Sequence, residues 1–146
     1  MIIHKAYQFR LYPNNIQKEM INKTLGCTRF IYNYFLNRKQ TEYKNNKKSI
    51  SAYECIKELP NLYKDRPYLK EIDSMSLRCA IFDLEDAYKG FYKKIRNYPN
   101  FKKKYDKNSY RTNRITSNYK EAHYENIKLD LKNKTITLPK LKEMKI

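Results

Sequence analysis

Three carboxylates, Asp83, Glu85 and Asp86, are the closest approach to a catalytic cluster in this chain of 146 residues. Metal-dependent nucleases hold Mg²⁺ at substrate phosphates with carboxylates gathered in this way. Their spacing, however, places them on or beside the polar side of an amphipathic helical segment, with Lys89 and Lys93 within reach one or two turns later. We therefore interpret them as a solvated helix face and predict no catalytic residue in this chain.

Other reactive side chains are scattered along the sequence. His4 and His123 are far apart, no Ser or Cys lies in a nucleophile motif, and two glycines are too few for a glycine-rich phosphate loop. Cys27, Cys55 and Cys79 are widely spaced and odd in number, which predicts neither a disulfide framework nor a zinc site. We expect three small buried or half-buried residues there, and no metal or other cofactor in this chain.

A run of cations interleaved with aromatic rings begins at Phe101 and is the better candidate for a functional site. Lysine and arginine neutralise phosphates, and exposed rings stack on unpaired bases. From this run, and from two arginines nearer the N-terminus whose planar forks can bind phosphate bidentately, we predict RNA or phosphate contacts by Arg10, Arg29, Lys102, Lys103, Lys104, Tyr105, Tyr110 and Arg111. A disordered basic tail over residues 102–109 is the alternative, and Arg29 could instead stack on Tyr32 or pair with a carboxylate.

The overall charge agrees with a polyanionic partner. Thirty-two Lys and Arg against fifteen Asp and Glu give +17, and residues 89–146 hold 17 of the basic but only 5 of the acidic side chains. A solvated lysine-rich surface is the bland alternative. No apolar stretch approaches the roughly 20 residues of a membrane-spanning helix, and the N-terminus lacks a signal-peptide core. We expect an intracellular, cytoplasmic or nucleoid-associated protein with no membrane partner.

The N-terminal third predicts a strand followed by two helices. Residues 2–11 alternate between apolar and polar side chains, as a half-buried strand does. Asn14 and Gln17 form a helix-capping pair, and the helix that follows should close or bend at Gly26. A second helix then continues an apolar face to about Asn45.

Two further helices and a β-hairpin follow. Ser51 and Glu54 form another capping pair, opening a short helix that Pro60 should stop. Asp73 or Ser74 caps the most regular helix, whose apolar stripe is Leu77, Ile81, Leu84, Tyr88, Phe91 and Ile95. Residues 110–116 are a weak strand candidate, whereas residues 127–131 and 136–138 alternate cleanly and predict a hairpin with its turn at Asn133.

This order of elements predicts an α+β fold. We expect the first strand to join the late strands in a small β-sheet or barrel, with a helical bundle inserted between them. The corresponding domains are a β domain formed by residues 1–12 and 97–146 and a helical domain formed by residues 13–96.

Five ordered blocks resemble the N-terminal part of the OrfB/TnpB-type proteins of insertion sequences, RNA-guided DNA endonucleases related to the type V CRISPR nucleases. The blocks are residues 9–14, 26–36, 98–102, 109–112 and 138–141. One departure is Lys142-Glu143, where the family often has Gly-Trp. An older interpretation of the same region is the helix-turn-helix of a transposase, formed by the first two helices.

The resemblance implies a wedge domain like an oligonucleotide-binding fold, interrupted by a helical recognition domain, which together bind guide RNA and a short motif in duplex DNA. It implies that the DNA is approached by Ser74, Arg78, Thr112, Arg114 and Thr116. The RuvC-like nuclease carboxylates and the zinc ribbon of the family, and with them Mg²⁺ and zinc, would lie beyond Ile146.

We therefore expect a non-catalytic, truncated or split lobe that binds structured RNA and double-stranded DNA. A separately encoded nuclease domain would complete it as one half of an enzyme. The alternatives are a stand-alone DNA-binding regulator derived from the same family and a decayed remnant without a retained role.

Overall fold

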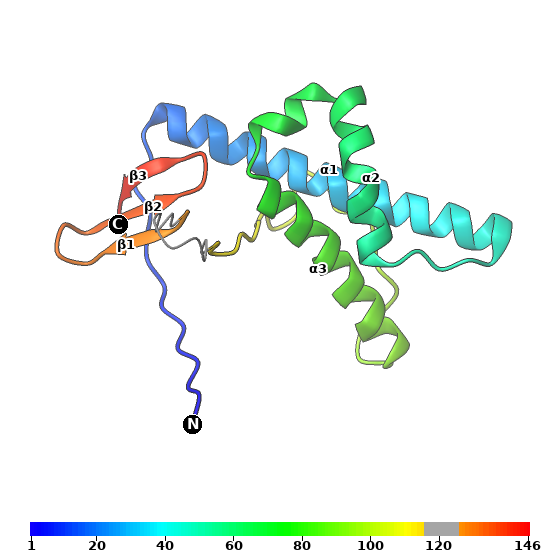
Figure 1. Ribbon diagram of the computed structural model, residues 1–146. Coiled ribbons are helices and arrows are strands. Elements are labelled where there is room, and N and C mark those ends of the chain that lie inside the picture. Colours follow the sequence, from blue (N-terminus) through cyan, green and yellow to red (C-terminus); the bar gives the residue numbers. More distant parts are fainter. Residues whose placement is uncertain (116–125) are drawn as a thin grey trace, which may run out of the picture. The chain divides into compact units, whose positions relative to one another are not determined.

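The computed structural model describes residues 1–115 and 126–146 (Figure 1). Its elements are the helices α1 (Asn15–Asn46), α2 (Ala52–Asp65) and α3 (Ser74–Tyr92), the 3-10 helix η1 (Pro67–Glu71), and the strands β1 (Lys128–Asp130), β2 (Thr135–Leu138) and β3 (Lys142–Lys145). The predicted α+β class is confirmed. No helix in the described ranges has both the length and the apolar character needed to cross a membrane.

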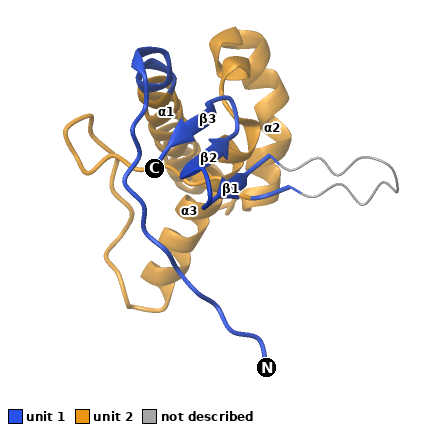
Figure 2. Cartoon of the chain, turned by 90° about the vertical axis from the view of Figure 1, so that its left-hand side faces the viewer, with its two compact units in different colours: residues 1–20, 114–146 blue, residues 21–113 orange. Residues whose placement is uncertain are grey.

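The chain forms two compact units (Figure 2). One consists of Met1–Met20 and Arg114–Ile146 and contains the sheet, and the other is Ile21–Asn113 and contains the helices. We call them the sheet unit and the helical unit. The domain boundaries that we predicted from the sequence stay a prediction about the intact protein.

Three helices share the core of the helical unit. Their fully buried side chains include Ile31, Phe35 and Leu36 of α1, Cys55 of α2, and Leu77, Ile81 and Leu84 of α3. Polar links tie the same helices together at the edges of this core, because Arg38 of α1 pairs with Glu58 of α2 at 3.4 Å and Lys39 of α1 pairs with Glu85 of α3 at 3.2 Å. The helices thus form a small bundle whose order depends mainly on apolar burial.

Helix α1 corrects the prediction of two helices. It runs unbroken through Gly26, whose backbone has no positive φ, and buried residues lie on both sides of the glycine, from Thr24 to Ile31. A glycine costs a helix interior only about 1 kcal/mol, which packing of the flanking turns easily offsets. The helix-turn-helix interpretation of residues 13–45 is therefore wrong for this structure.

Helix α2 corrects a second boundary. Its predicted start is confirmed, because the Ser51 hydroxyl accepts from Glu54 N at 3.3 Å and the Glu54 carboxylate accepts from Ser51 N at 2.8 Å. Pro60 does not stop it, and the helix continues to Asp65. The proline ring is exposed while Leu59 and Leu62 are buried, so burial on the inner face compensates for the lost backbone hydrogen bond.

Helix α3 begins as predicted, with the Asp73 carboxylate accepting from Met75 N at 3.2 Å. Its predicted core stripe is only half right. Leu77, Ile81 and Leu84 are fully buried, but Phe91 is exposed, and Ile95 is both exposed and beyond the end of the helix. The C-terminal part of α3 thus carries aromatic side chains that the core does not cover.

The sheet unit holds three antiparallel strands in the order β1-β2-β3. The predicted hairpin is confirmed, with Leu129 opposite Ile136, and the turn is held by Asp130, whose carboxylate accepts from Asn133 N at 3.0 Å. The predicted capping pair is also present, since Gln17 N donates to Asn14 Oδ1 at 2.8 Å. The Gln17 amide in turn donates to the carbonyls of Leu141 and Glu143, joining the start of α1 to the sheet.

The predicted first strand is wrong apart from one contact. Residues 1–11 are exposed and have no regular structure, and only Tyr12 forms a bridge, with Lys145 of β3. An alternating segment becomes a strand only when something covers its apolar side, and here Ile3 and Tyr7 remain 65% and 73% exposed. Among the described residues the sheet therefore does not close into a barrel, and residues 110–115 form no strand.

Candidate nucleic-acid interface

The basic segment Phe101–Arg111 is fixed to the helices of its unit at two points. The Asn33 side chain on α1 donates to the carbonyl of Lys102 at 2.9 Å and accepts from Lys102 N at 2.8 Å. At the other end, Arg111 pairs with Asp83 of α3 at 2.6 Å. The tail alternative for residues 102–109 therefore does not describe this structure, because the segment has fixed ends and internal hydrogen bonds.

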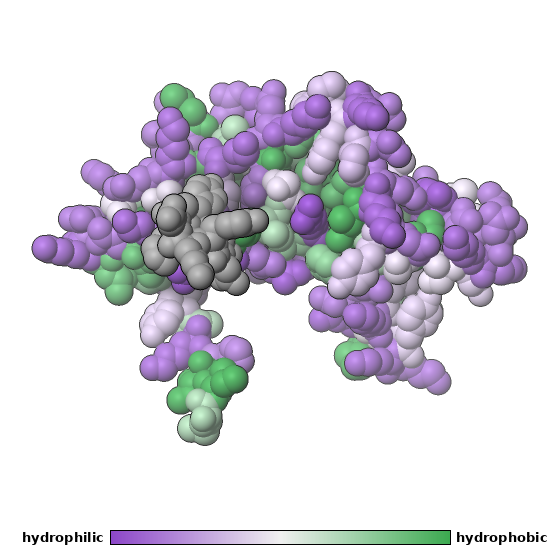
Figure 3. Space-filling model, in the orientation of Figure 1, coloured by the Kyte–Doolittle hydropathy of each residue, from purple (hydrophilic) through white to green (hydrophobic). Residues whose placement is uncertain are grey.

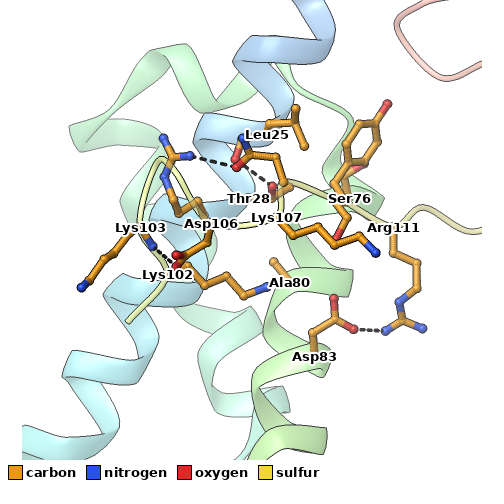
Figure 4. A pocket seen from close by; sticks show the side chains of 14 residues that line it. Leu25, Thr28, Ser76, Ala80, Asp83, Lys102, Lys103, Asp106, Lys107 and Arg111 are labelled. Atoms are coloured by element: carbon orange, nitrogen blue, oxygen red, sulfur yellow. Dashed lines mark hydrogen bonds and ion pairs between the residues drawn. The ribbon is translucent and has the colours of Figure 1, made fainter. Parts of the chain in front are cut away.

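A pocket of about 230 Å³ lies between this segment, α1 and α3 (Figure 4). Buried Thr28 and Ser76 contribute to its lining. Its cationic lining residues are Arg29, Lys102, Lys103, Lys107 and Arg111, against two carboxylates. One of these carboxylates, Asp83, is already paired with Arg111, and the other, Asp106, accepts from Lys103 N at 2.8 Å. The pocket thus keeps an excess of positive charge, as a phosphate site requires.

Two predicted phosphate ligands have defined positions at this pocket. The ammonium of Lys102 lies 4.4 Å from the centroid of the Tyr32 ring, a cation–π contact that orients the side chain. Arg29 does not stack on Tyr32; its Nη1 donates to Asn108 Oδ1 at a long 3.5 Å. The position that stacking would have given to Arg29 is therefore occupied by Lys102.

The two tyrosines of the segment differ. Tyr105 is 94% exposed, so its ring is open to a partner. Tyr110 is half-buried, and burial, with a smaller contribution from Asp73, raises the pKa of its hydroxyl. Its ring is already packed against the unit, which leaves Tyr105 as the better stacking candidate.

Three of the predicted DNA-binding residues lie at one end of α3. Ser74 is the first residue of that helix, Arg78 is exposed one turn later, and the Thr112 hydroxyl donates to the Asp73 carboxylate at 2.6 Å. Because Asp73 caps α3, this hydrogen bond places Thr112 beside the same helix end.

The remaining predicted residues fall elsewhere. Arg10 and Arg114 belong to the sheet unit, where the Arg10 guanidinium lies 5.7 Å from the centroid of the Tyr12 ring. Thr116 and His123 are outside the described residues. Lys104 is exposed, and its carbonyl accepts from the Asn108 amide.

The structure also corrects the picture of the acidic group. Asp83 and Glu85 are paired with Arg111 and Lys39, not with Lys89 and Lys93. Asn33, which anchors the basic segment, was missed because a polar residue at one helical position gives no sign of a partner 69 residues away. Among the residues that the structure describes, no three His, Cys, Asp or Glu side chains are placed to hold a metal ion.

Comparison with known proteins gives a consistent result. A family model described as a helix-turn-helix domain of the OrfB type found in IS605 insertion sequences matches residues 1–48, a range in which this structure has α1 without an internal turn. "Putative RNA-guided DNA endonuclease InsQ" of Escherichia coli strain K12 is 29% identical over 94% of this chain and 32% of its own length. A "Putative RNA-guided DNA endonuclease" of Streptomyces pristinaespiralis is 26% identical over 68% of this chain and 25% of its own length.

A third relative is much shorter. "Virulence protein VsdF" of Salmonella dublin is 30% identical over 70% of this chain, and the match covers 96% of that protein. The chain belongs to the OrfB/TnpB-type family of insertion-sequence proteins. It spans about a quarter to a third of the length of the two endonuclease relatives.

Proposed function

We propose that this chain is the nucleic-acid-binding lobe of a transposon-associated, RNA-guided DNA endonuclease of this family, and that it binds guide RNA and the DNA beside the target without cleaving either. The observation that carries this proposal is the basic segment Phe101–Arg111, which Asn33 and Asp83 fix in place beside a positively charged pocket. A charged tail could bind any polyanion, whereas a fixed set of cations can match one arrangement of phosphates.

RNA contact in this proposal is made by the segment and its pocket. Lys102, Lys103 and Lys104 neutralise backbone phosphates, and exposed Tyr105 stacks on an unpaired base. Arg29 and Arg111 add guanidinium groups at the pocket, although Arg111 must share its charge with Asp83. In the sheet unit, Arg10 supplies a further phosphate contact, and the sheet itself is part of the wedge domain of the intact protein.

DNA contact is assigned to the N-terminal end of α3. Arg78 reads a base edge, while Ser74 and Thr112 contact the backbone next to it, where the helix dipole also favours phosphate. Arg114 and Thr116 follow Thr112 in the chain and would extend this contact.

The test is the salt dependence of binding to a structured RNA. We expect the joint replacement of Lys102, Lys103 and Lys104 by Ala to weaken binding and to lower the salt slope by about one unit per lost phosphate contact. The matched control removes three exposed lysines of α2 and η1, Lys57, Lys64 and Lys70, with the same loss of charge. Equal effects of the two triple variants would reduce the proposal to nonspecific attraction.

The short relative favours a second candidate, a stand-alone DNA-binding regulator. VsdF consists almost entirely of the region that this chain matches, so members of the family exist at about this length. The two candidates differ in their need for RNA: a guide-dependent lobe binds its DNA motif only with RNA present, whereas a regulator binds the duplex alone. Binding of a duplex fragment with and without RNA separates them.

A further inference from the structure

A second cavity of the helical unit, of about 420 Å³, lies where the C-terminal part of α3 faces the second half of α1. Its lining includes Tyr43 of α1, Tyr88 and Tyr92 of α3, and Tyr98. We propose that this tyrosine pocket binds an unpaired nucleobase of single-stranded nucleic acid. The inference rests on the proposed function, because it adds a base-binding site to a chain that binds nucleic acid.

The rings of the pocket are arranged as a stacking platform. Tyr88 and Tyr92 are stacked, with centroids 6.2 Å apart, and Tyr98 meets the Tyr88 ring edge to face at 5.5 Å. Phe91 packs against Tyr98 in the same way at 5.1 Å. The rings remain open to a ligand, since Tyr43, Tyr92 and Tyr98 are 58%, 67% and 41% exposed. On the face shown in Figure 3 hydrophilic residues predominate, and a gathered set of open rings is unusual unless something binds it.

Polar groups in the pocket suit the edge of a base. The hydroxyls of Tyr88 and Tyr98 lie 2.9 Å apart and share one hydrogen bond, which leaves one hydroxyl hydrogen to donate and lone pairs to accept. Burial and this hydrogen bond raise the pKa of Tyr88, so its hydroxyl stays protonated at neutral pH. Ser49 adds another hydroxyl to the lining.

The charges favour an anionic aromatic ligand over an organic cation, the other ligand that aromatic cages bind. The one carboxylate of the pocket, Glu85, is paired with Lys39 at 3.2 Å, and Lys39 also donates to the Ile50 carbonyl. Lys89 lines the pocket, and the Lys47 ammonium lies 5.2 Å from the centroid of the Tyr43 ring. The lining therefore carries net positive charge, which fits a nucleotide whose base stacks in the pocket while its phosphate meets a lysine.

The experiment is photocrosslinking of the full chain to a short single-stranded oligonucleotide that contains 5-iodouridine, followed by trypsin and peptide mass spectrometry. Cleavage after lysine and arginine separates residues 90–93, which contain Tyr92, and residues 97–102, which contain Tyr98, from residues 105–107 and 108–111 of the basic segment. We expect crosslinks on the first two peptides. The Tyr92→Leu variant should reduce them about tenfold, as expected for loss of one base-stacking ring.

The matched control is Tyr68→Leu, which removes a ring that is 49% exposed on η1 and should leave the crosslinks unchanged. Crosslinks confined to residues 105–111 would overturn the pocket while leaving the proposed function in place. An oligonucleotide that neither binds nor crosslinks at low salt would overturn both. An equal loss in Tyr92→Leu and Tyr68→Leu would also overturn the pocket, because it would reflect a general loss of rings.

Discussion

The side-chain amide of Asn33 grips the backbone of Lys102 with two hydrogen bonds, one donated to the carbonyl at 2.9 Å and one accepted from the amide N–H at 2.8 Å. No other side chain forms both bonds to one peptide group in the same way, because only a primary amide offers a donor and an acceptor side by side. This pair converts a lysine-rich stretch into a segment with a fixed starting point on α1.

Loss of that anchor should weaken RNA binding without removing a phosphate contact. For Asn33→Ala we expect a five- to tenfold lower affinity for structured RNA, since two hydrogen bonds worth about 1 kcal/mol each no longer order the segment before binding. The slope of affinity against salt should stay at the wild-type value. A lowered slope, or an unchanged affinity, would show that the anchor does not prepare the segment for RNA.

Arg78 should control DNA sequence preference. Replacement of Arg78 by Ala should relax the preference for the DNA motif, by an amount equivalent to about 1–3 kcal/mol, and barely change nonspecific affinity. The measurement is competition binding with a set of duplexes that differ in the motif. Lys70→Ala, which removes an exposed charge from η1, is the control, and a preference unchanged in Arg78→Ala removes Arg78 from the DNA site.

Gly26 should tolerate a methyl group and gain stability from it. An added Cβ would meet nothing within 4 Å, and the glycine has helical backbone angles inside α1. Gly26→Ala should therefore raise the free energy of unfolding by about 0.5–1 kcal/mol, which urea unfolding followed by circular dichroism would measure. A destabilised variant would mean that α1 bends at Gly26 after all.

Cys55 should make the chain less stable at alkaline pH. Burial raises the pKa of its thiol from 9.0 to about 11, so the folded thiol stays protonated where the unfolded thiol ionises. A group whose pKa is raised by folding loses its stabilising contribution as pH rises above the unfolded value. Unfolding free energies measured at pH 8 and at about pH 10.5 should therefore fall more for the wild type than for Cys55→Ala. Parallel losses in the two proteins would contradict this.

Local patterns predicted much of the fold. The capping pairs Asn14–Gln17 and Ser51–Glu54 and the hairpin around Asn133 are present, because each depends on residues a few positions apart. Gly26 and Pro60 failed as boundaries because burial of neighbouring side chains outweighs the local cost of either residue. The strand at residues 2–11 failed since alternation alone does not supply a surface to cover it.

The candidate site divides in the same way. Composition and the spacing of Lys102 to Lys104 pointed to the basic segment, but the contacts that fix it join residues far apart in sequence, as Asn33 and Lys102 or Asp83 and Arg111 do. The tyrosine pocket was also hidden, because Tyr88 and Tyr92 follow the apolar stripe of α3 and predict a core or rim position. Only the structure shows that the core ends at Leu84.

The most direct test of the central claim is to express the chain within its native locus, purify it, and sequence the RNA that accompanies it, beside the variant that lacks Lys102, Lys103 and Lys104. We predict one discrete structured transcript, strongly enriched with the wild type and depleted with the triple Ala variant. Bulk cellular RNA without enrichment, or the same transcript at the same level with both proteins, would contradict the account.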